Sequence, residues 1–402
     1  MKIAIIGQGY VGLPIAIQAA NSGFNVLGFD IDNTLVVNLN SAISHIQDVS
    51  NADIKRVIDS GNFHSSSNPA ELQGAEIVVI AVPTPLDDLR QPDLSFLENV
   101  CNLLGKYLLK RALIINESTS YPGTLRNFIS ARIEGISAMG HYYAISPERV
   151  DPGNINWNIS NTPRIFSGLT PEASQKTKDF YGKFCNNLVE VSSPEVAEAA
   201  KLFENTFRQV NIALVNEFAL ATRSLGIPIR EVLEASASKP YGFMKFNPGL
   251  GVGGHCIPVD PSYFSFAAAN IGASTEFINL ANRINLEMPN KIVTIIAKEI
   301  GVPLTGKKIL VCGISYKPNI ADIRESPSLR LVNSLIELGA EVSWHDPVVK
   351  TFNGEVSVKL PSEHFDLAIL AVAHDQMDLE AVYNCAEIVF DCVGKMPKAI
   401  QL

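Results

Sequence analysis

The first thirty residues place the tightest constraint on how this chain can fold. A short apolar run over residues 2–6 leads directly into a G-x-G-x-x-G pattern over residues 7–12. A helical pattern follows, and the next apolar run, residues 25–29, ends at Asp30. Strand, glycine turn, helix and strand-end acid occur in the order expected of a dinucleotide-binding βαβ unit, with the acid roughly twenty residues after the turn. This opening predicts an α/β fold built on a parallel sheet.

The same turn suggests a cofactor. Glycines carry no Cβ, so the backbone can approach a pyrophosphate that sits on the following helix N-terminus. Asp30 would accept hydrogen bonds from the adenosine ribose and would repel the 2′-phosphate of NADP, which favours NAD. The alternative is a glycine turn that only packs a helix on a sheet. The residues expected to hold NAD here are Gly7, Gly9, Gly12 and Asp30.

Bulk properties exclude several classes of protein. The 402 residues are too many for one ordinary core and indicate two or three domains. The net charge of -9, without any Lys/Arg run, gives no sign of a nucleic-acid partner. The six cysteines form no C-x-x-C pair, so we expect no metal site. With no signal peptide and no membrane-length apolar run, we expect a cytoplasmic protein without a membrane partner.

Further apolar runs over residues 76–82, 113–116 and 142–146 predict additional buried strands. Each ends in a polar loop, and the first two loops contain Thr84 and Thr119. Ligands of open α/β sheets bind at the carboxyl ends of the strands. Ordinary turn chemistry would explain any one of these loops equally well. Their recurrence at successive strand ends favours a site.

A long helical pattern runs from Pro194 to about Leu225. Four polar residues recur at spacings that place them on one helical face: Glu198, Lys201, Asn205 and Arg208. A solvated face of ion pairs is the commoner meaning of such a stripe. Here apolar neighbours indicate burial, and a buried polar stripe needs partners. A helix of this length also suits a homodimer interface, although it could serve as a spacer alone.

A glycine-rich segment over residues 249–260 contains Cys256, with Asp260 four residues later. A thiol held against a ligand beside a proton-transfer group is how a covalent nucleophile is built. A buried structural cysteine in a glycine turn is the competing interpretation. Residues 274–300 are again helical in pattern.

A second α/β unit begins near Gly306 and has no complete glycine fingerprint. It would bind the nucleotide part of a substrate, or it could be purely structural. We therefore expect two Rossmann-like, doubly wound domains joined by a long central helix and a helical middle region. The predicted segments are residues 1–193 for NAD, 194–300 for dimerisation and the cysteine, and 301–402 for the nucleotide part of a substrate.

Seven motifs in order give the chain a resemblance to a known family. They are G-x-G-Y-V-G, V-P-T-P, E-S-T-x-x-P-G, S-P-E-R, E-x-A-K-L-x-E-N, G-G-H-C-I-P-V-D and K-x-x-x-x-D-x-R-E-S-P. Together they resemble the UDP-glucose/GDP-mannose dehydrogenase family over essentially the whole chain. The resemblance implies oxidation of the C6 alcohol of a nucleotide sugar to a carboxylate with two NAD, in a pathway of polysaccharide synthesis.

The resemblance also implies roles for individual residues. Cys256 would be the nucleophile, and its thiohemiacetal would be oxidised to a thioester that water cleaves. Catalytic roles fall on Cys256, Lys201, Asp260, Asn205, Glu148 and Thr119. The resemblance adds Tyr10, Val11, Thr84, Thr119 and Arg324 to the residues that would hold NAD. Substrate contacts fall on Glu148, Arg149, Val150, Lys201, Asn205, Arg208, Gly253, Tyr316 and Lys317. Sequence alone does not divide the role of hydrolytic base between Asp260 and Glu148.

Subgroup patterns favour a UDP-N-acetylhexosamine as the substrate. Val259 stands where UDP-glucose enzymes tend to carry Lys, and K-P-Y-G-F over residues 239–243 resembles the enzymes for UDP-N-acetylglucosamine or its galactosamine epimer. UDP-glucose, UDP-N-acetylmannosamine and GDP-mannose are the alternative substrates, and a nucleotide-sugar-binding protein without catalysis is the non-enzyme alternative. The chain departs from the family at Leu35, where many relatives carry a basic residue, and in D-C-V-G-K at 391–395.

Overall fold

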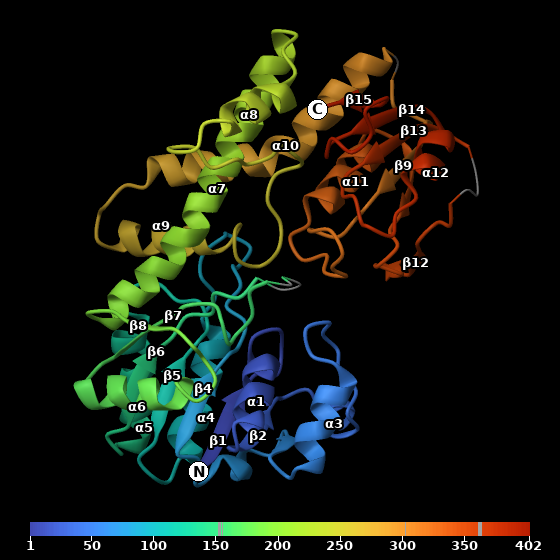
Figure 1. The fold of residues 1–402 in the computed structure, drawn as a ribbon. Helices are drawn as coiled ribbons and strands as arrows, with labels where there is room; N and C mark the ends of the chain where they lie inside the picture. Colours follow the sequence, from blue (N-terminus) through green and yellow to red (C-terminus); the bar gives the residue numbers. More distant parts are fainter. Residues whose placement is uncertain (152–153, 155, 302, 361–363) are drawn as a thin grey trace. The chain divides into compact units, whose positions relative to one another are not determined.

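The computed structural model describes residues 1–402 except 152–153, 155, 302 and 361–363, so Pro152 and Gly153 of one predicted loop lie outside the described residues. Contacts divide the chain into two compact units (Figure 1). The first unit comprises Met1–Glu204 and Ser262–Gly272, and the second comprises Asn205–Pro261 and Ala273–Leu402. Each unit is described by itself below.

The first unit is built on an eight-stranded sheet in the order β3-β2-β1-β4-β5-β6-β7-β8. Among the described strand pairs of this sheet, only the β6–β7 pair is antiparallel. The strands are β1 (Lys2–Ile6), β2 (Asn25–Phe29), β3 (Phe63–Ser66), β4 (Ile77–Ile80), β5 (Leu113–Asn116), β6 (Tyr142–Ile145), β7 (Arg164–Gly168) and β8 (Leu188–Glu190). The central strands read as continuous apolar runs because helices bury them on both faces.

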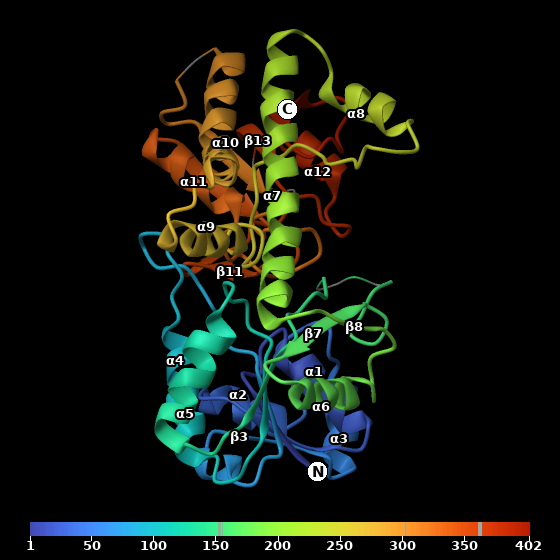
Figure 2. The ribbon, with the colours of Figure 1, turned by 90° about the vertical axis from the view of Figure 1, so that its left-hand side faces the viewer.

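Alternate residues of β1 enter two different cores. Ile3 and Ile5 face α1, α3 and α6, whereas Ala4 and Ile6 face α4 and α5. Figure 2 shows these two groups of helices on opposite sides of the sheet. The helices are α1 (Gly12–Asn21), α2 (Asn33–Asn40), α3 (Asn51–Asp59), η1 (Pro69–Leu72), α4 (Ser95–Tyr107), η2 (Leu125–Ser130), α5 (Ala131–Ser137) and α6 (Pro171–Tyr181).

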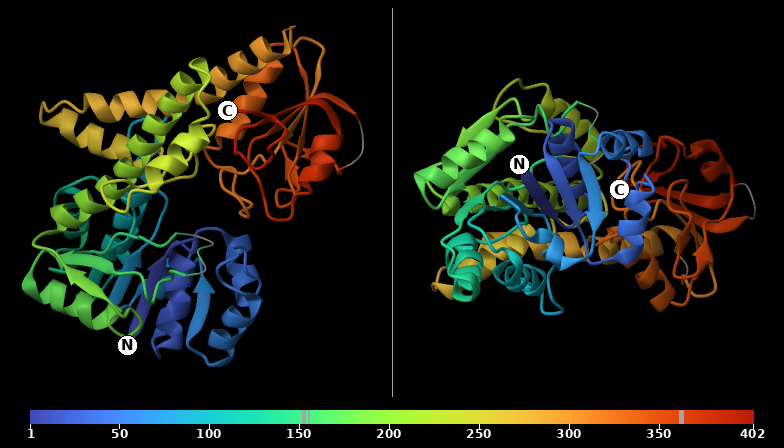
Figure 3. Two further views of the ribbon diagram at one scale, coloured as in Figure 1. Left: turned by 45° about the horizontal axis from the view of Figure 1, so that its top comes forward. Right: turned by 90° about the horizontal axis from the view of Figure 1, so that it is seen from below.

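The second unit contains a five-stranded sheet in the order β10-β9-β13-β14-β15, with every described pair parallel. α10 and α11 pack on one face (Figure 3), and α12 contributes to the core on the other. The strands are β9 (Lys308–Cys312), β10 (Glu341–His345), β13 (Phe365–Leu370), β14 (Ala386–Asp391) and β15 (Ile400–Gln401), with a small hairpin of β11 (Thr351–Phe352) and β12 (Glu355–Val356).

Two helices run through both units: α7 (Pro194–Ser224) and α9 (Asp260–Asn270). The remaining helices are α8 (Ile229–Ala237), α10 (Glu276–Ile300), α11 (Pro327–Glu337) and α12 (Leu379–Asn384). Two doubly wound α/β layers with a long central helix and a helical middle region are therefore present, and the predicted fold class is confirmed. The segment boundaries at residues 193 and 300 remain predictions. Among the described residues, no helix is both long enough and apolar enough to cross a bilayer.

Candidate active site

The turn after β1 fits a pyrophosphate. Gly7 has φ +89°, and a Cβ there would lie 2.5 Å from the carbonyl oxygen of Ala81. A Cβ on Gly12 would lie 1.8 Å from the carbonyl oxygen of Gly7, whereas nothing lies within 4 Å of one on Gly9. No side chain caps the start of α1, so its first amides can bind an anion. The glycines are therefore required by the turn at positions 7 and 12, and the backbone is approachable at position 9.

Asp30 lies at the carboxyl end of β2, next to this turn. Its Oδ2 accepts the Gln8 amide at 2.8 Å, and its Oδ1 accepts the Asp32 amide at 3.0 Å. The residue is only half-buried, so the carboxylate retains lone pairs for further donors. A fixed, accessible carboxylate at this position fits the ribose hydroxyls of NAD.

The loops after β4 and β5 lie side by side. The Ser118 hydroxyl accepts the Val82 amide at 2.9 Å and donates to the Val82 carbonyl at 2.8 Å. Thr84 and Thr119 are both half-buried on these loops. Because β1, β4 and β5 are neighbours in the sheet, the structure brings both threonines to the same edge as the glycine turn.

Glu148 is held by a buried charge cluster that sequence reasoning missed. Its Oε1 accepts the amides of Arg149 at 2.7 Å and Val150 at 2.5 Å, and its Oε2 lies 3.5 Å from Arg164 Nη2. Arg164 also pairs with the buried Glu117 through Nη1 and Oε1, 2.5 Å apart. Burial raises the pKa of Glu117 to about 7, against the opposing charge of Arg164. These contacts fix the Glu148 carboxylate in the first unit.

Glu198, the first residue of the polar stripe on α7, has its partners in the loop after β5. Its carboxylate accepts the Ser120 hydroxyl at 3.1 Å and the amides of Gly123 at 2.6 Å and Leu125 at 3.0 Å. Burial raises the pKa of Glu198 to about 7, although these hydrogen bonds lower it. Glu198 therefore holds the loop that carries Thr119.

The other stripe residues have different surroundings. Lys201 and Asn205 are buried, whereas Arg208 is exposed. Asn205 Nδ2 donates to Asp260 Oδ2 at 2.6 Å, and Asp260 is itself buried at the start of α9. The structure thus joins two predicted catalytic residues of the second unit, and Asn205 fixes the orientation of the Asp260 carboxylate.

Buried amide side chains anchor the glycine-rich segment that precedes Cys256. Asn216 Oδ1 accepts the Gly249 amide at 2.9 Å, and its Nδ2 donates to Asn285 Oδ1 at 3.2 Å. Gly251 has φ +112°, and a Cβ there would lie 2.4 Å from the Asn285 carbonyl oxygen. Pro289 has no amide hydrogen for that carbonyl, so the segment approaches α10 where the helix interior is interrupted.

Cys256 differs from the other cysteines. It is half-buried, while the other five are buried, and burial raises the pKa of each of those thiols. Its Sγ lies 3.1 Å from His255 Nδ1, and its carbonyl accepts the Asp260 amide at 2.8 Å. A backbone hydrogen bond therefore links the residue with the accessible thiol to Asp260.

The remaining predicted residues are distributed over both units. Tyr316 packs on the cysteine segment, since a Cβ on Gly253 would lie 2.7 Å from Tyr316 Cβ. Lys317 follows it and is half-buried. Arg149 pairs with Glu204 in the first unit, Nη2 to Oε1 at 2.5 Å, and the exposed Arg324 pairs with Asp322 in the second. Both arginines are thus engaged by carboxylates.

Comparisons with known families account for most of the chain. Residues 1–185 match the NAD binding domain, residues 195–287 the central domain and residues 310–396 the UDP binding domain of the UDP-glucose/GDP-mannose dehydrogenase family. The chain belongs to this family. It is an NAD-dependent oxidoreductase, so the predicted cofactor is confirmed, and its UDP binding domain supports a nucleotide-sugar substrate.

Similar proteins cover nearly the full length. The chain is 35% identical over 390 residues to UDP-N-acetyl-D-glucosamine 6-dehydrogenase of Pseudomonas aeruginosa, covering 94% of this chain and 91% of the relative. It is 34% identical over 390 residues to UDP-N-acetyl-D-mannosamine dehydrogenase of Pyrococcus horikoshii, covering 94% and 90%. A solved structure of UDP-D-ManNAc dehydrogenase from Pyrococcus horikoshii has a TM-score of 0.91 at 30% identity, covering 100% of this chain and 98% of that one.

Proposed function

We propose that this chain oxidises the C6 hydroxyl of a UDP-N-acetylhexosamine, with UDP-N-acetylglucosamine as the first choice, to the carboxylate. The observation that carries the proposal is Cys256: it is the one cysteine of the six that is not buried, and it lies on a segment anchored by the Asn216 side chain. The family match supports the reaction class. The choice of sugar rests on the K-P-Y-G-F motif and on the Pseudomonas aeruginosa relative, whereas the Pyrococcus horikoshii relative favours the mannosamine epimer.

The proposed reaction passes through intermediates that are bonded to the Cys256 sulfur. In the first step the C6 hydroxyl loses a proton and C6 loses a hydride, which gives an aldehyde. The thiolate then bonds to C6, and a second hydride leaves the adduct to give a thioester. Water attacks this carbonyl, the C–S bond breaks, and the acid and the thiolate are released. When NAD is bound, it takes up the hydride of each step.

Other residues have roles that follow from charge. Lys201 and Asn205 supply a cation and an amide donor for the oxyanions that form at C6. Asp260, oriented by Asn205, and Glu148, fixed by Arg164, are the carboxylates available to activate water. Thr119 would help to hold that water. NAD would be held by Gly7, Gly9, Tyr10, Val11, Gly12, Asp30, Thr84, Thr119 and Arg324.

The nucleotide sugar requires its own contacts. We assign them to Glu148, Arg149, Val150, Lys201, Asn205, Arg208, Gly253, Tyr316 and Lys317. The family match to a UDP binding domain over residues 310–396 supports the last two assignments.

A stripe of exposed apolar residues on α7 supports a homodimer. Phe207, Leu214 and Phe218 are 41, 59 and 50% exposed and recur on one helical face, and Leu225, 72% exposed, directly follows the helix. The opposite face carries Asn216, which bonds to α10. Exposed apolar side chains in such a stripe favour burial against a partner, and a second copy of the chain offers an identical stripe. Light scattering should give the mass of two chains, and a single-chain mass would contradict the dimer.

A panel of nucleotide sugars tests the function. UDP-N-acetylglucosamine, its galactosamine and mannosamine epimers, UDP-glucose and GDP-mannose would each be mixed with protein and NAD, and NADH would be followed by absorbance. We expect the highest kcat/KM with UDP-N-acetylglucosamine. A preference for UDP-glucose or GDP-mannose would overturn the hexosamine assignment, and no NADH with any sugar would favour the non-catalytic binding protein.

A further inference from the structure

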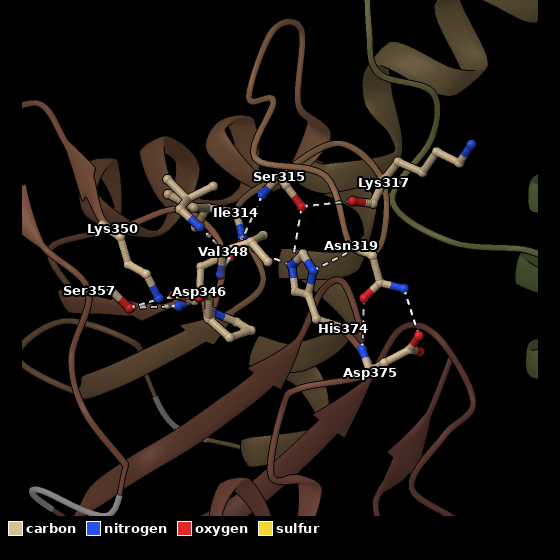
Figure 4. A network of polar contacts seen from close by, with 12 residues as sticks. Ile314, Ser315, Lys317, Asn319, Asp346, Val348, Lys350, Ser357, His374 and Asp375 are labelled. Atoms are coloured by element: carbon tan, nitrogen blue, oxygen red, sulfur yellow. Dashed lines mark hydrogen bonds and ion pairs between the residues drawn. The ribbon is translucent and has the colours of Figure 1, made fainter. Parts of the chain in front are cut away.

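His374 is a buried residue in the loop after β13, and its ring contacts residues of two other loops of the second sheet (Figure 4). Its Nδ1 accepts the Asn319 backbone amide at 2.8 Å, and its Nε2 lies 3.1 Å from Asp346 Oδ2. A backbone amide is always a donor, so Nδ1 carries no proton. The ring is therefore the neutral tautomer with its hydrogen on Nε2, facing Asp346.

The Asp346 carboxylate accepts hydrogen bonds from backbone amides of the loops after β9 and β10. Its Oδ2 accepts the amides of Ile314 at 2.8 Å and Ser315 at 3.2 Å, and its Oδ1 accepts those of Val348 and Val349, both at 2.9 Å. The residue is 1% exposed. Every lone pair of this carboxylate is directed at the protein itself.

The residues between these contacts form a segment that is fixed at both ends, which we call the clamped segment, residues 314–319. Asp346 holds its first two amides and His374 holds its last. Inside it, the Ser315 hydroxyl donates to the Lys317 carbonyl at 2.9 Å. At its end, the Asn319 amide group donates to and accepts from Asp375 at 2.8 and 2.9 Å. The backbone of the clamped segment therefore has little freedom.

The clamped segment also carries the side chains of Tyr316 and Lys317. Figure 4 shows the Lys317 side chain extending away from the network. The Tyr316 ring lies against the cysteine segment, because a Cβ on Gly254 would lie 2.8 Å from it. A displaced Asn319 would shift both side chains, since they stand between the fixed ends.

We propose that His374 and Asp346 are positioning residues for nucleotide-sugar binding, which hold the clamped segment so that Tyr316 and Lys317 meet the nucleotide. This inference rests on the proposed function, because it takes Tyr316 and Lys317 as substrate contacts. Neither positioning residue touches the sugar or takes part in proton transfer. Their loss therefore raises KM and leaves kcat nearly unchanged.

The chain offers a matched control in the first unit. His141 is also a buried histidine whose Nδ1 accepts a backbone amide, that of Ala112 at 3.1 Å. Its other neighbours are Glu134 and Tyr143, outside the predicted substrate contacts. Replacing either histidine by Leu removes the acceptor of one backbone amide, in a buried hydrogen bond at Ala112 and a part-buried one at Asn319. Only the change at His374 reaches the clamped segment.

The test measures UDP binding by calorimetry for wild type, His374→Leu and His141→Leu. We expect His374→Leu to weaken UDP binding about tenfold, since it leaves the Asn319 amide without its acceptor, and to raise KM for UDP-N-acetylglucosamine equally. We expect His141→Leu to bind UDP as wild type does while lowering Tm by a similar amount. Equal UDP affinity for wild type and His374→Leu would overturn the positioning role and leave the proposed function standing. A wild type that binds no UDP would instead contradict the proposed function.

A second pair of variants keeps the test decisive if His374→Leu does not fold. His374→Asn retains an acceptor near the position of Nδ1, whereas His374→Gln retains a donor near the position of Nε2. We expect the Asn variant to bind UDP within about threefold of wild type, and the Gln variant more weakly than the Asn variant. Equal affinities for the two would overturn the clamp on Asn319.

Discussion

After the first strand of each sheet, the chain turns at a glycine with nearly the same backbone: φ is +89° at Gly7 and +88° at Gly313. Each glycine amide donates, at 2.8 Å, to the carbonyl of the last residue of the neighbouring strand, Phe29 in one case and His345 in the other. A Cβ at either position would meet a carbonyl oxygen, at 2.5 Å in the first sheet and 2.3 Å in the second. The two sheets therefore begin with the same backbone geometry, a first strand followed by a glycine turn.

They differ in what the acid at the end of the second strand does. Asp30 is half-buried and binds the amides of Gln8 and Asp32. Asp346 is buried, and its carboxylate oxygens already accept hydrogen bonds from four backbone amides and from His374. A strand-end carboxylate can accept ribose hydroxyls only if its own loops have not already taken its lone pairs. The first sheet meets this condition and the second does not.

Asp346→Asn gives the largest expected difference between the sheets. The amide nitrogen would face backbone donors in a buried site, so we expect a loss of about 3–5 kcal/mol in the free energy of unfolding. Asp30→Asn, at a half-exposed position, should cost about 1 kcal/mol. Urea unfolding of both variants measures this difference, and equal losses would show that the two carboxylates are equivalent.

The buried carboxyls of the two units should also give opposite pH dependence. Burial raises the pKa of Glu198 from 4.5 to about 7, so the folded state holds its proton where the unfolded chain has lost it. Its contribution is complete below pH 4.5 and is lost as the pH rises through 7. For Asp346, burial raises the pKa, but hydrogen bonds from His374, Val349 and Val348 lower it to about 2. Its contribution is present above its unfolded pKa and is lost as the pH falls toward 2.

Glu198→Gln isolates the first of these effects. The stability of wild type relative to this variant should fall by up to about 3 kcal/mol between pH 4.5 and pH 8. Urea unfolding at several pH values measures the slope. Parallel curves for the two proteins would mean that Glu198 is already ionised throughout this range.

The smallest expected effect concerns the accessible carboxylate itself. Asp30→Asn should weaken NAD binding about tenfold, because a neutral amide accepts ribose hydroxyls less strongly, and should reduce the discrimination against NADP. Asp32→Asn is the matched control, since Asp32 only caps α2. Fluorescence titration with both dinucleotides measures the effect. Unchanged NAD affinity in Asp30→Asn would show that Asp30 does not contact the ribose.

Local patterns explain which features were predictable. The glycine turn and Asp30 lie within one βαβ unit, so their spacing alone reports their proximity. The polar stripe on α7 was visible in the sequence, but the partner of Glu198 was not, because the loop of Gly123 is 75 residues away. Arg164 and Glu117 were missed for the same reason, being separated by 47 residues.

The polar network of the second sheet could not be predicted from the sequence for the same reason. Asp346 directly follows β10, but nothing local in the sequence shows that the loops after β9 and β13 converge on it. The unit boundary at Glu204 falls inside one continuous helix. An unbroken helical pattern carries no composition change at such a point, so the sequence offered no signal for it.

The central claim is that Cys256 forms a bond to the C6 carbon of the substrate. Its most direct test is the stoichiometry of NADH and acid for wild type and Cys256→Ser with UDP-N-acetylglucosamine. We predict two NADH per acid for wild type and, for the variant, a loss of acid formation of about a thousandfold or more with UDP binding retained. Acid formation by Cys256→Ser at the wild-type rate would contradict the account.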